Sequence, residues 1–299
     1  MLRTIRLGSR ASTLALTQTE LVLSALQARH PEQAFEVRRI STHGDQVLDR
    51  SLTAIGGKGV FVREIEEALL AGEIDLAVHS FKDLPTVQPE GLVVGAVTER
   101  ADPRDVLAAG PGVALAGLPA GARVGTSSRR RAVQLRSMRP DLAVADIRGN
   151  VETRLRKLDG GQYDAIILAA AGLARLGLLG RATQIFDPKV FLPAPGQGAL
   201  ALELRAADAE VAALLAPLDH APTRAAVAAE RALLAGLGGG CDLPIGAYAW
   251  LEAGQLALRA LSADEAGHIA SGEAYGSPDD PCALGRQLAM ALLQPGGAR

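Results

Sequence analysis

Residues 122–169 read ARVGTSSRRRAVQLRSMRPDLAVADIRGNVETRLRKLDGGQYDAIILA, and this stretch decides the fold. It alternates strand signals (ARVGTS, AVADI, YDAIILA) with two helical segments. The first helix is expected to begin at Ser127 or Ser128 and the second at Asn150, because small polar side chains cap helix N-termini. Strands that alternate with helices predict an α/β lobe.

The same alternation occupies the first hundred residues, where RTIRLGS, FEVRRI, IDLAVHS and LVVGAV predict strands. A helix capped by Ser12 is expected to stop at Pro31. Its expected apolar face consists of Leu14, Gln18, Leu21, Ala25 and Leu26. Another helix, ended by Gly72, is expected to bury Phe61, Ile65, Ala68 and Leu69. Two paired lobes result, and the glycine- and proline-rich residues 100–121 between them predict a hinge or crossover.

The pattern changes after GQGALALELR (residues 196–205). PTRAAVAAERALLAGL predicts a helix, AYAWL, QLALRALSAD and HIASGEAYG predict three strands, and a last helix begins at Pro281. This is a small α+β module, with Trp250 expected in its core. We therefore expect residues 1–99 plus about 195–217 as a first lobe, 100–194 as a second, and 218–299 as a C-terminal domain.

Composition excludes several protein classes. The 299 residues carry a formal charge of −2 and are 48% hydrophobic, as in an ordinary globular protein. Two cysteines cannot build a disulfide framework, no secretory signal is visible, and the longest uncharged run, Val106–Ala122, is broken by proline and glycine. We expect a cytoplasmic protein with no membrane segment.

Charge is concentrated in one segment. Residues 123–157 hold nine arginines and one lysine against three acids, a net charge of +7, so the remainder carries −9. No aromatic residue lies in this segment, which argues against single-stranded nucleic acid as the partner. The five histidines are scattered and no CxxC or HExxH occurs, so no metal site is expected. A small polyanionic ligand fits best.

Basic residues follow three predicted strands. They are Arg130 and Arg131 in GTSSRRRAVQL, Arg148 and Arg154 in DIRGNVETRL, and Arg10, next to the cap Ser12, in GSRAS. Free N–H groups at helix N-termini and guanidinium groups favour carboxylate or phosphate, and ligands of open α/β sheets bind at this edge. The alternative is a solvated helix face.

Two further segments could carry chemistry. AVHSFKDLP places His79, Ser80, Lys82 and Asp83 at a strand exit, where Asp83 could serve as a general acid or as the counter-charge of a cation. The alternative is a surface turn. LGGGCDLPIG predicts that Cys241 is displayed on a tight loop, although most free cysteines are simply buried.

Eight ordered blocks from residue 7 to about 248 together resemble the porphobilinogen deaminase (hydroxymethylbilane synthase) family. They are GSRASTLAL, GGKGVFVREIE, DLAVHSFKDLPT, GTSSRRRAVQL, DIRGNVETRL, YDAIILAAAGLARLGL, LPAPGQGALALE and GGGCDLPIGAYA. The resemblance implies two lobes with mixed sheets, like type II periplasmic binding proteins, and a small C-terminal α+β domain. It implies a monomeric transferase that joins four porphobilinogen molecules head to tail with release of ammonia.

The resemblance also implies the roles of individual residues. Cys241 would carry a dipyrromethane cofactor through a thioether, and Asp83 would be the catalytic acid. Carboxylates of cofactor and substrate would be contacted by Arg10, Ser12, Ser80, Lys82, Thr126, Ser128, Arg130, Arg131, Arg148 and Arg154, with Gln197 nearby and Lys58 in the GGKG loop as a further contact. Two other interpretations stay open, a two-lobed carboxylate-binding protein without catalysis and a nucleic-acid-binding domain.

Overall fold

A computed structural model describes residues 3–41, 62–239 and 243–294. The chain divides into two compact units. Unit 1 comprises Met1–Arg100 and Ala199–Arg224, and unit 2 comprises Ala101–Gly198 and Ala225–Arg299. The division into three domains stays a prediction, because the contacts within the chain divide it into two compact units.

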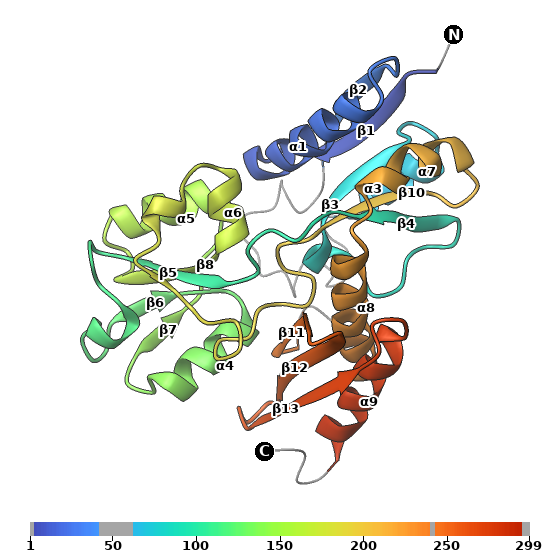
Figure 1. Ribbon diagram of the computed structural model, residues 1–299. Helices are drawn as coiled ribbons and strands as arrows, with labels where there is room; N and C mark the ends of the chain where they lie inside the picture. The colour runs from blue at the N-terminus through green and yellow to red at the C-terminus, as the bar shows by residue number, and fades with distance from the viewer. Residues whose placement is uncertain (1–2, 42–61, 240–242, 295–299) are drawn as a thin grey trace. The chain divides into compact units, whose positions relative to one another are not determined.

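Unit 1 is built on a five-stranded mixed sheet in the order β2-β1-β3-β10-β4 (Figure 1). Its elements are β1 (Ile5–Arg10), α1 (Thr13–Arg29), β2 (Phe35–Ile40), α3 (Arg63–Leu70), β3 (Leu76–Ser80), β4 (Leu92–Val97), β10 (Leu200–Arg205) and α7 (Ala209–Leu215). β1 runs parallel to β2 and β3, whereas β10 is antiparallel to β3 and β4. Apolar residues of α1 and α7 pack on one face of the sheet, and those of α3 pack on the other.

Unit 2 contains a second five-stranded sheet, in the order β7-β6-β8-β5-β9. Its elements are β5 (Asp105–Ala109), β6 (Arg123–Gly125), α4 (Arg129–Met138), β7 (Ala143–Ala145), α5 (Val151–Asp159), β8 (Ala165–Ala169), α6 (Ala170–Arg175) and β9 (Gln184–Ile185). β6 is parallel to β7 and β8, and β5 is antiparallel to β8 and β9. The strand arrangement therefore repeats that of unit 1, which confirms the predicted pairing of lobes.

The prediction for residues 100–121 was wrong in part. The segment contains β5, whose residues Val106, Leu107 and Ala108 are fully buried between β8 and β9. DVLAA is short and has few of the β-branched or aromatic side chains that mark strands, so the surrounding glycines and prolines dominated the pattern.

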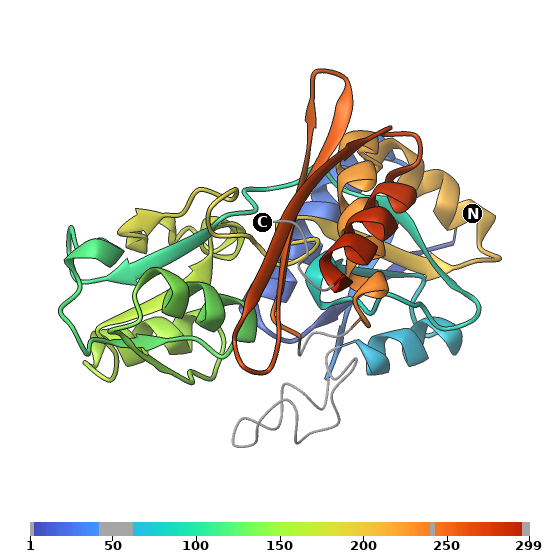
Figure 2. The same ribbon diagram turned by 90° about the horizontal axis from the view of Figure 1, so that it is seen from below.

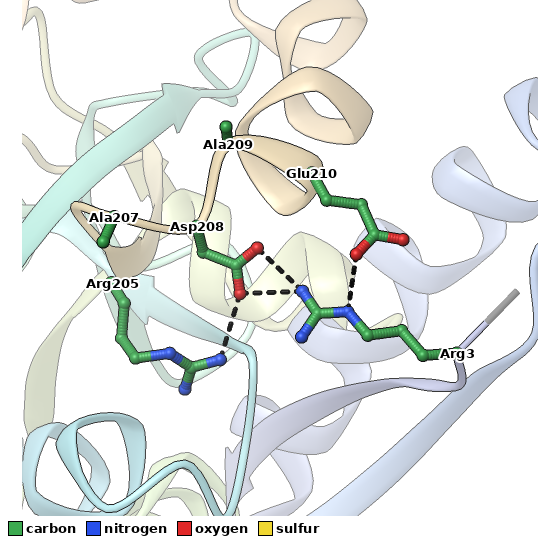
Figure 3. Close-up of a pocket in the computed structure, with 6 residues that line it drawn as sticks. All are labelled: Arg3, Arg205, Ala207, Asp208, Ala209 and Glu210. Atoms are coloured by element: carbon green, nitrogen blue, oxygen red, sulfur yellow. Dashed lines mark hydrogen bonds and ion pairs between the residues drawn. The ribbon is translucent and has the colours of Figure 1, made fainter.

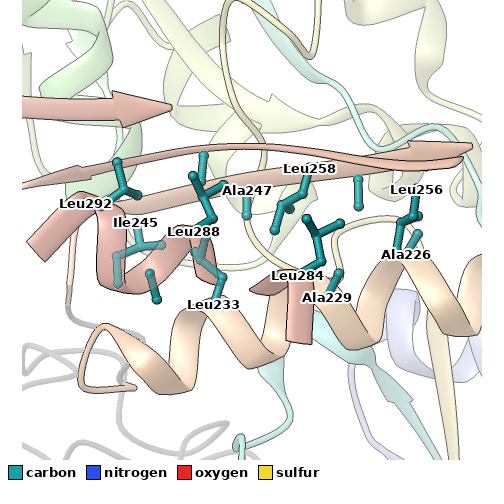
Figure 4. Close-up of a cluster of buried hydrophobic side chains, with 13 residues drawn as sticks. Ala226, Ala229, Leu233, Ile245, Ala247, Leu256, Leu258, Leu284, Leu288 and Leu292 are labelled. Carbon is teal, nitrogen blue, oxygen red and sulfur yellow. The ribbon is translucent and has the colours of Figure 1, made fainter. Parts of the chain in front are cut away.

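The C-terminal part is an antiparallel sheet of β11 (Ile245–Glu252), β12 (Gln255–Ala263) and β13 (Ile269–Gly276). Figure 2 shows α8 (Ala221–Gly236) and α9 (Pro281–Leu293) on the same side of this sheet. Leu233, Leu258 and Leu288 meet in the core between them (Figure 4). A Cβ at Gly285 would lie 2.3 Å from the Ala229 carbonyl oxygen, so glycine is what allows α9 to approach α8.

The prediction that Trp250 lies in this core is wrong. Alternation along β11 turns Ile245, Ala247 and Ala249 inward and Trp250 to the opposite face. Its half-buried ring stacks on Tyr248, and Lys189 Nζ lies 4.0 Å from the ring centroid.

The predicted helix starts are confirmed. Ser12, Ser128 and Asn150 are the N-cap residues of α1, α4 and α5, and each accepts a hydrogen bond from a backbone N–H of the first turn. The face of α1 is shifted from the prediction, since Ala15 and Val22 are buried and Leu21 is half exposed. Among the described helices, none has the length and apolarity needed to cross a bilayer.

Candidate functional site

The exit of β3 displays Asp83 on a short, well-anchored turn. The strand ends at Ser80 and continues into one 3₁₀ turn, Phe81–Asp83. Phe81 is buried and its N–H donates to the Ala199 carbonyl at 3.0 Å, which fixes the start of the turn. Lys82 is half buried and Asp83 is exposed. A carboxylate is thus held on rigid backbone and open to a ligand, as catalytic geometry requires.

Other predicted residues of unit 1 lie at the same sheet edge. β1 and β3 are parallel neighbours, so Arg10 at the end of β1 and Ser80 at the end of β3 share that edge. Ser12 follows Arg10 and accepts a 3.3 Å hydrogen bond from the Ala15 N–H at the start of α1. The buried Gln18 of α1 donates from Nε2 to Ser80 Oγ at 2.9 Å. The structure brings these residues together as predicted.

In unit 2 the ends of β6 and β7 likewise share an edge with the N-termini of α4 and α5. Ser128 caps α4, and Thr126 Oγ1 accepts a 3.2 Å hydrogen bond from the Ser128 N–H. Arg148 follows β7, and its Nε lies 3.4 Å from a carboxylate oxygen of Asp146. This edge gathers helix N-termini and a guanidinium group, a combination that favours anions.

Arg130 and Arg131, which were expected to contact ligand carboxylates, are held by partners within unit 2. Both are almost fully buried, and both donate to Asp105 of β5 with shortest distances of 2.7 Å. Gln197 is also buried and donates from Nε2 to Asp105 at 2.9 Å. Burial alone would raise the pKa of Asp105, but the two arginine charges and their hydrogen bonds outweigh it and hold that pKa well below its usual range.

Three arginines of unit 2 form a cluster of like charge. The pKa of Arg154 is lowered to about 10, chiefly by burial, with smaller contributions in the same direction from the charges of Arg131 and Arg148 and an opposing one from Asp146. Arg154 Nε donates to the Gly149 carbonyl at 2.8 Å, a neutral partner. A bound anion would stabilise these arginines, because its charge offsets both their mutual repulsion and the cost of their burial.

Sequence reasoning missed two charged residues of unit 2. Asp105 was assigned to a hinge, although a carboxylate beside an apolar run signals a paired buried charge. Arg175 is the only charged residue from 165 to 180. Burial lowers its pKa to about 10, and its Nη2 donates to the Gly198 carbonyl at 2.8 Å. It is a further candidate for binding a carboxylate.

Two predicted site residues, Cys241 and Lys58, lie outside the described residues, as does Phe61 of the expected helix face. Within the described ranges, no cluster of histidine, cysteine, aspartate and glutamate is suited to a metal ion.

Two cavities, one in each unit, lie away from the predicted residues. The cavity in unit 1 has a volume of about 400 Å³. There Arg3 is bonded to Asp208 and Glu210, both at 2.7 Å, and Arg205 to Asp208 at 3.0 Å (Figure 3). These charges neutralise one another. A second cavity, of about 730 Å³, lies in unit 2 beside Tyr163 and the Asp159–Arg181 ion pair.

Comparison with known proteins identifies the family. Residues 5–213 match the family model "Porphobilinogen deaminase, dipyromethane cofactor binding domain" and residues 224–294 match "Porphobilinogen deaminase, C-terminal domain". The porphobilinogen deaminase of Roseiflexus sp. (strain RS-1) is 57% identical over 297 residues, 99% of this chain and 98% of the relative. That of Syntrophobacter fumaroxidans is 51% identical over 298 residues, covering 99% and 96%. A putative methionine-binding lipoprotein from Bacillus subtilis is similar in structure at a TM-score of 0.45 and 12% identity, covering 72% of this chain and 89% of its own. The chain therefore belongs to the porphobilinogen deaminase family and is a transferase of tetrapyrrole synthesis.

Proposed function

We propose that this chain condenses four porphobilinogen molecules to hydroxymethylbilane, with Asp83 as the catalytic carboxylate and a dipyrromethane cofactor attached to Cys241 through a thioether. The observation that carries the proposal is the placement of Arg148 and Arg154 at the sheet edge where α4 and α5 begin, since helix N-termini and guanidinium groups together favour an anion. The family match over nearly the whole chain supports the same reaction. We propose further that the protein acts in the cytoplasm as a monomer.

The residues present fit a ligand that bears several carboxylates. Each pyrrole of the cofactor and the substrate carries two carboxylates, and these would meet guanidinium groups and free N–H groups of helix N-termini. We assign the cofactor to Ser80, Lys82, Asp83, Thr126, Ser128, Arg130, Arg131, Arg148 and Cys241. We assign the substrate to Arg10, Ser12, Lys58, Arg148, Arg154 and Gln197.

Arg130, Arg131 and Gln197 would act from fixed positions. Asp105 holds all three, so they lose little side-chain entropy when a ligand binds. Arg154 and Arg148 would bind carboxylates more directly, because each is only partly buried. When bound, the cofactor supplies a tethered, electron-rich terminal pyrrole.

Asp83 would stabilise the positive charge that develops on porphobilinogen. The bond between the methylene carbon and the nitrogen of the protonated aminomethyl group breaks, ammonia leaves with the electron pair, and the substrate is left as a cation. An ionised carboxylate that accepts a hydrogen bond from the pyrrole N–H lowers the energy of this cation. The bound cofactor would supply the pyrrole carbon that bonds to the methylene carbon, with loss of the proton on that pyrrole carbon.

The substitution Asp83→Asn tests this role, since it keeps the shape of the side chain and removes its charge. We expect turnover to fall by about 10² to 10⁴-fold while the cofactor content stays that of the wild type. Asp279→Asn, an exposed site in the turn before α9, is the matched control and should turn over normally. Wild-type turnover in Asp83→Asn would remove Asp83 from the mechanism, and the protein would then be assigned another catalytic group.

A further inference from the structure

Three ionisable side chains to which no role is assigned above are buried in unit 1. His79 of β3 and Glu203 of β10 have side chains exposed by 4% and 0%, and His79 Nε2 lies 3.0 Å from Glu203 Oε2. Glu66 projects from α3, which packs on this face of the sheet, and is 9% exposed. Burying three ionisable groups costs free energy unless hydrogen bonds or ion pairs among them compensate.

The charges of this cluster are not balanced one to one. Among the described residues, the Oε1 atoms of Glu66 and Glu203 are buried and have no hydrogen-bond partner. The pKa of Glu66 is raised to about 7, chiefly by burial and next by the charge of Glu203, while His79 opposes the rise and the exposed Glu67 contributes least. The neighbouring strand β4 (LVVGAV) brings no charge. Near neutral pH, Glu66 therefore carries a proton much of the time. His79 is the hydrogen-bond partner of Glu203.

This cluster sits directly behind the turn that displays Asp83. His79 is followed by Ser80 and then by the turn Phe81–Asp83. In the ladder of β3 with β10, Ala201 is paired with His79 and Glu203 with Ala77, so the His79–Glu203 contact links the two strands diagonally. It fastens the last residues of β3 to β10 through side chains, in addition to the backbone ladder.

We propose that His79 and Glu203 form a buried positioning pair that fixes the exit of β3 and thereby the orientation of Asp83. The proposal rests on the assigned role of Asp83. It makes these two residues positioning residues, which contact neither substrate nor cofactor. A displacement of about 1 Å at a reacting group can cost about 10²-fold in rate, so a contact that fixes a strand exit has a measurable effect.

Two substitutions of Glu203 distinguish the effect of side-chain length from the effect of charge. Glu203→Gln keeps the length of the side chain and an oxygen that accepts from His79 Nε2–H, but loses the charge. Glu203→Asp keeps the charge but withdraws the carboxylate by one methylene, which breaks the 3.0 Å contact. We expect Glu203→Asp to lower kcat about tenfold or more, with KM for porphobilinogen and cofactor content within about twofold of the wild type. Glu203→Gln should keep kcat within about threefold.

A second pair of variants, at His79, keeps the proposal testable if the Glu203 variants fail to fold. His79→Gln retains an N–H donor near the position of Nε2, whereas His79→Ala removes it, so we expect loss of kcat in the alanine variant and recovery in the glutamine variant. Glu73→Gln, an exposed glutamate in the turn after α3, is the control for the chemical change alone. Wild-type kcat in Glu203→Asp, or equal losses in Glu203→Asp and Glu203→Gln, would overturn the positioning pair. Either result leaves the role of Asp83 standing if Asp83→Asn is inactive.

Discussion

Arg130 Nη1 donates to Asp105 Oδ2 at 2.7 Å, and the two side chains are almost completely excluded from solvent. The pair joins α4, the helix that begins at the edge proposed to bind anions, to β5, an inner strand of the second sheet. Arg131 and Gln197 donate to the same carboxylate. One acid therefore sets the positions of three residues that sequence reasoning assigned to ligand binding.

Asp105→Asn should destabilise the protein strongly, because it leaves two buried guanidinium groups without a counter-charge. Breaking a buried ion pair from one side costs about 3–5 kcal/mol, and we expect a loss of this size in the free energy of unfolding measured with urea. Asp141→Asn removes the partner of Arg139 at a more exposed site and should cost less than about 1 kcal/mol. Equal, small losses in both variants would show that Asp105 is not structurally important.

Arg154→Gln should weaken substrate use without weakening the fold. The change removes a partly buried charge near Arg131 and Arg148 but also the hydrogen bond to the Gly149 carbonyl, so the free energy of unfolding should stay within about 1 kcal/mol of the wild type. A lost charge-assisted hydrogen bond is worth about 1.5–3 kcal/mol, which predicts a fall in kcat/KM of roughly 10 to 150-fold, measured by steady-state kinetics. Arg156→Gln, an exposed position of the same helix, is the control. If both variants kept the wild-type kcat/KM, the assignment of Arg154 to the substrate would be wrong.

Glu66→Gln should change how stability depends on pH. The pKa of Glu66 rises from 4.5 to about 7 on folding, so between these values the folded state holds a proton that the unfolded state has released. The unfolding free energy of the wild type therefore falls as pH rises through this window, by up to about 3 kcal/mol. Glutamine cannot ionise, so the stability of Glu66→Gln relative to the wild type should be greater at pH 8 than at pH 5. A difference that did not vary with pH would contradict the burial of an ionising Glu66.

Local signals in the sequence were sufficient for most of the elements. Ser12, Ser128 and Asn150 each cap the helix that they were expected to start, because an N-cap hydrogen bond involves only neighbouring residues. The same holds for Asp83 at a strand exit, since the apolar run before it and Pro85 after it define that exit. These features depend on short stretches of chain.

Features that depend on distant residues were not predictable. β5 is a strand because β8 and β9 lie on either side of it, although DVLAA has little strand propensity of its own. α1 is apolar on several sides, so its sequence could not decide between a face on Leu21 and one on Val22. The partner of Arg130 lies 25 positions away on the misassigned segment, so the ion pair could not be inferred.

The intact mass of the purified, denatured protein tests most directly whether Cys241 holds the cofactor on which the proposed reaction depends. The protein should be produced in a host that makes porphobilinogen. We predict a mass in excess of the sequence by two linked pyrrole units, and no excess in Cys241→Ala. A wild-type chain with the unmodified mass, or an excess that persists in Cys241→Ala, would contradict the account.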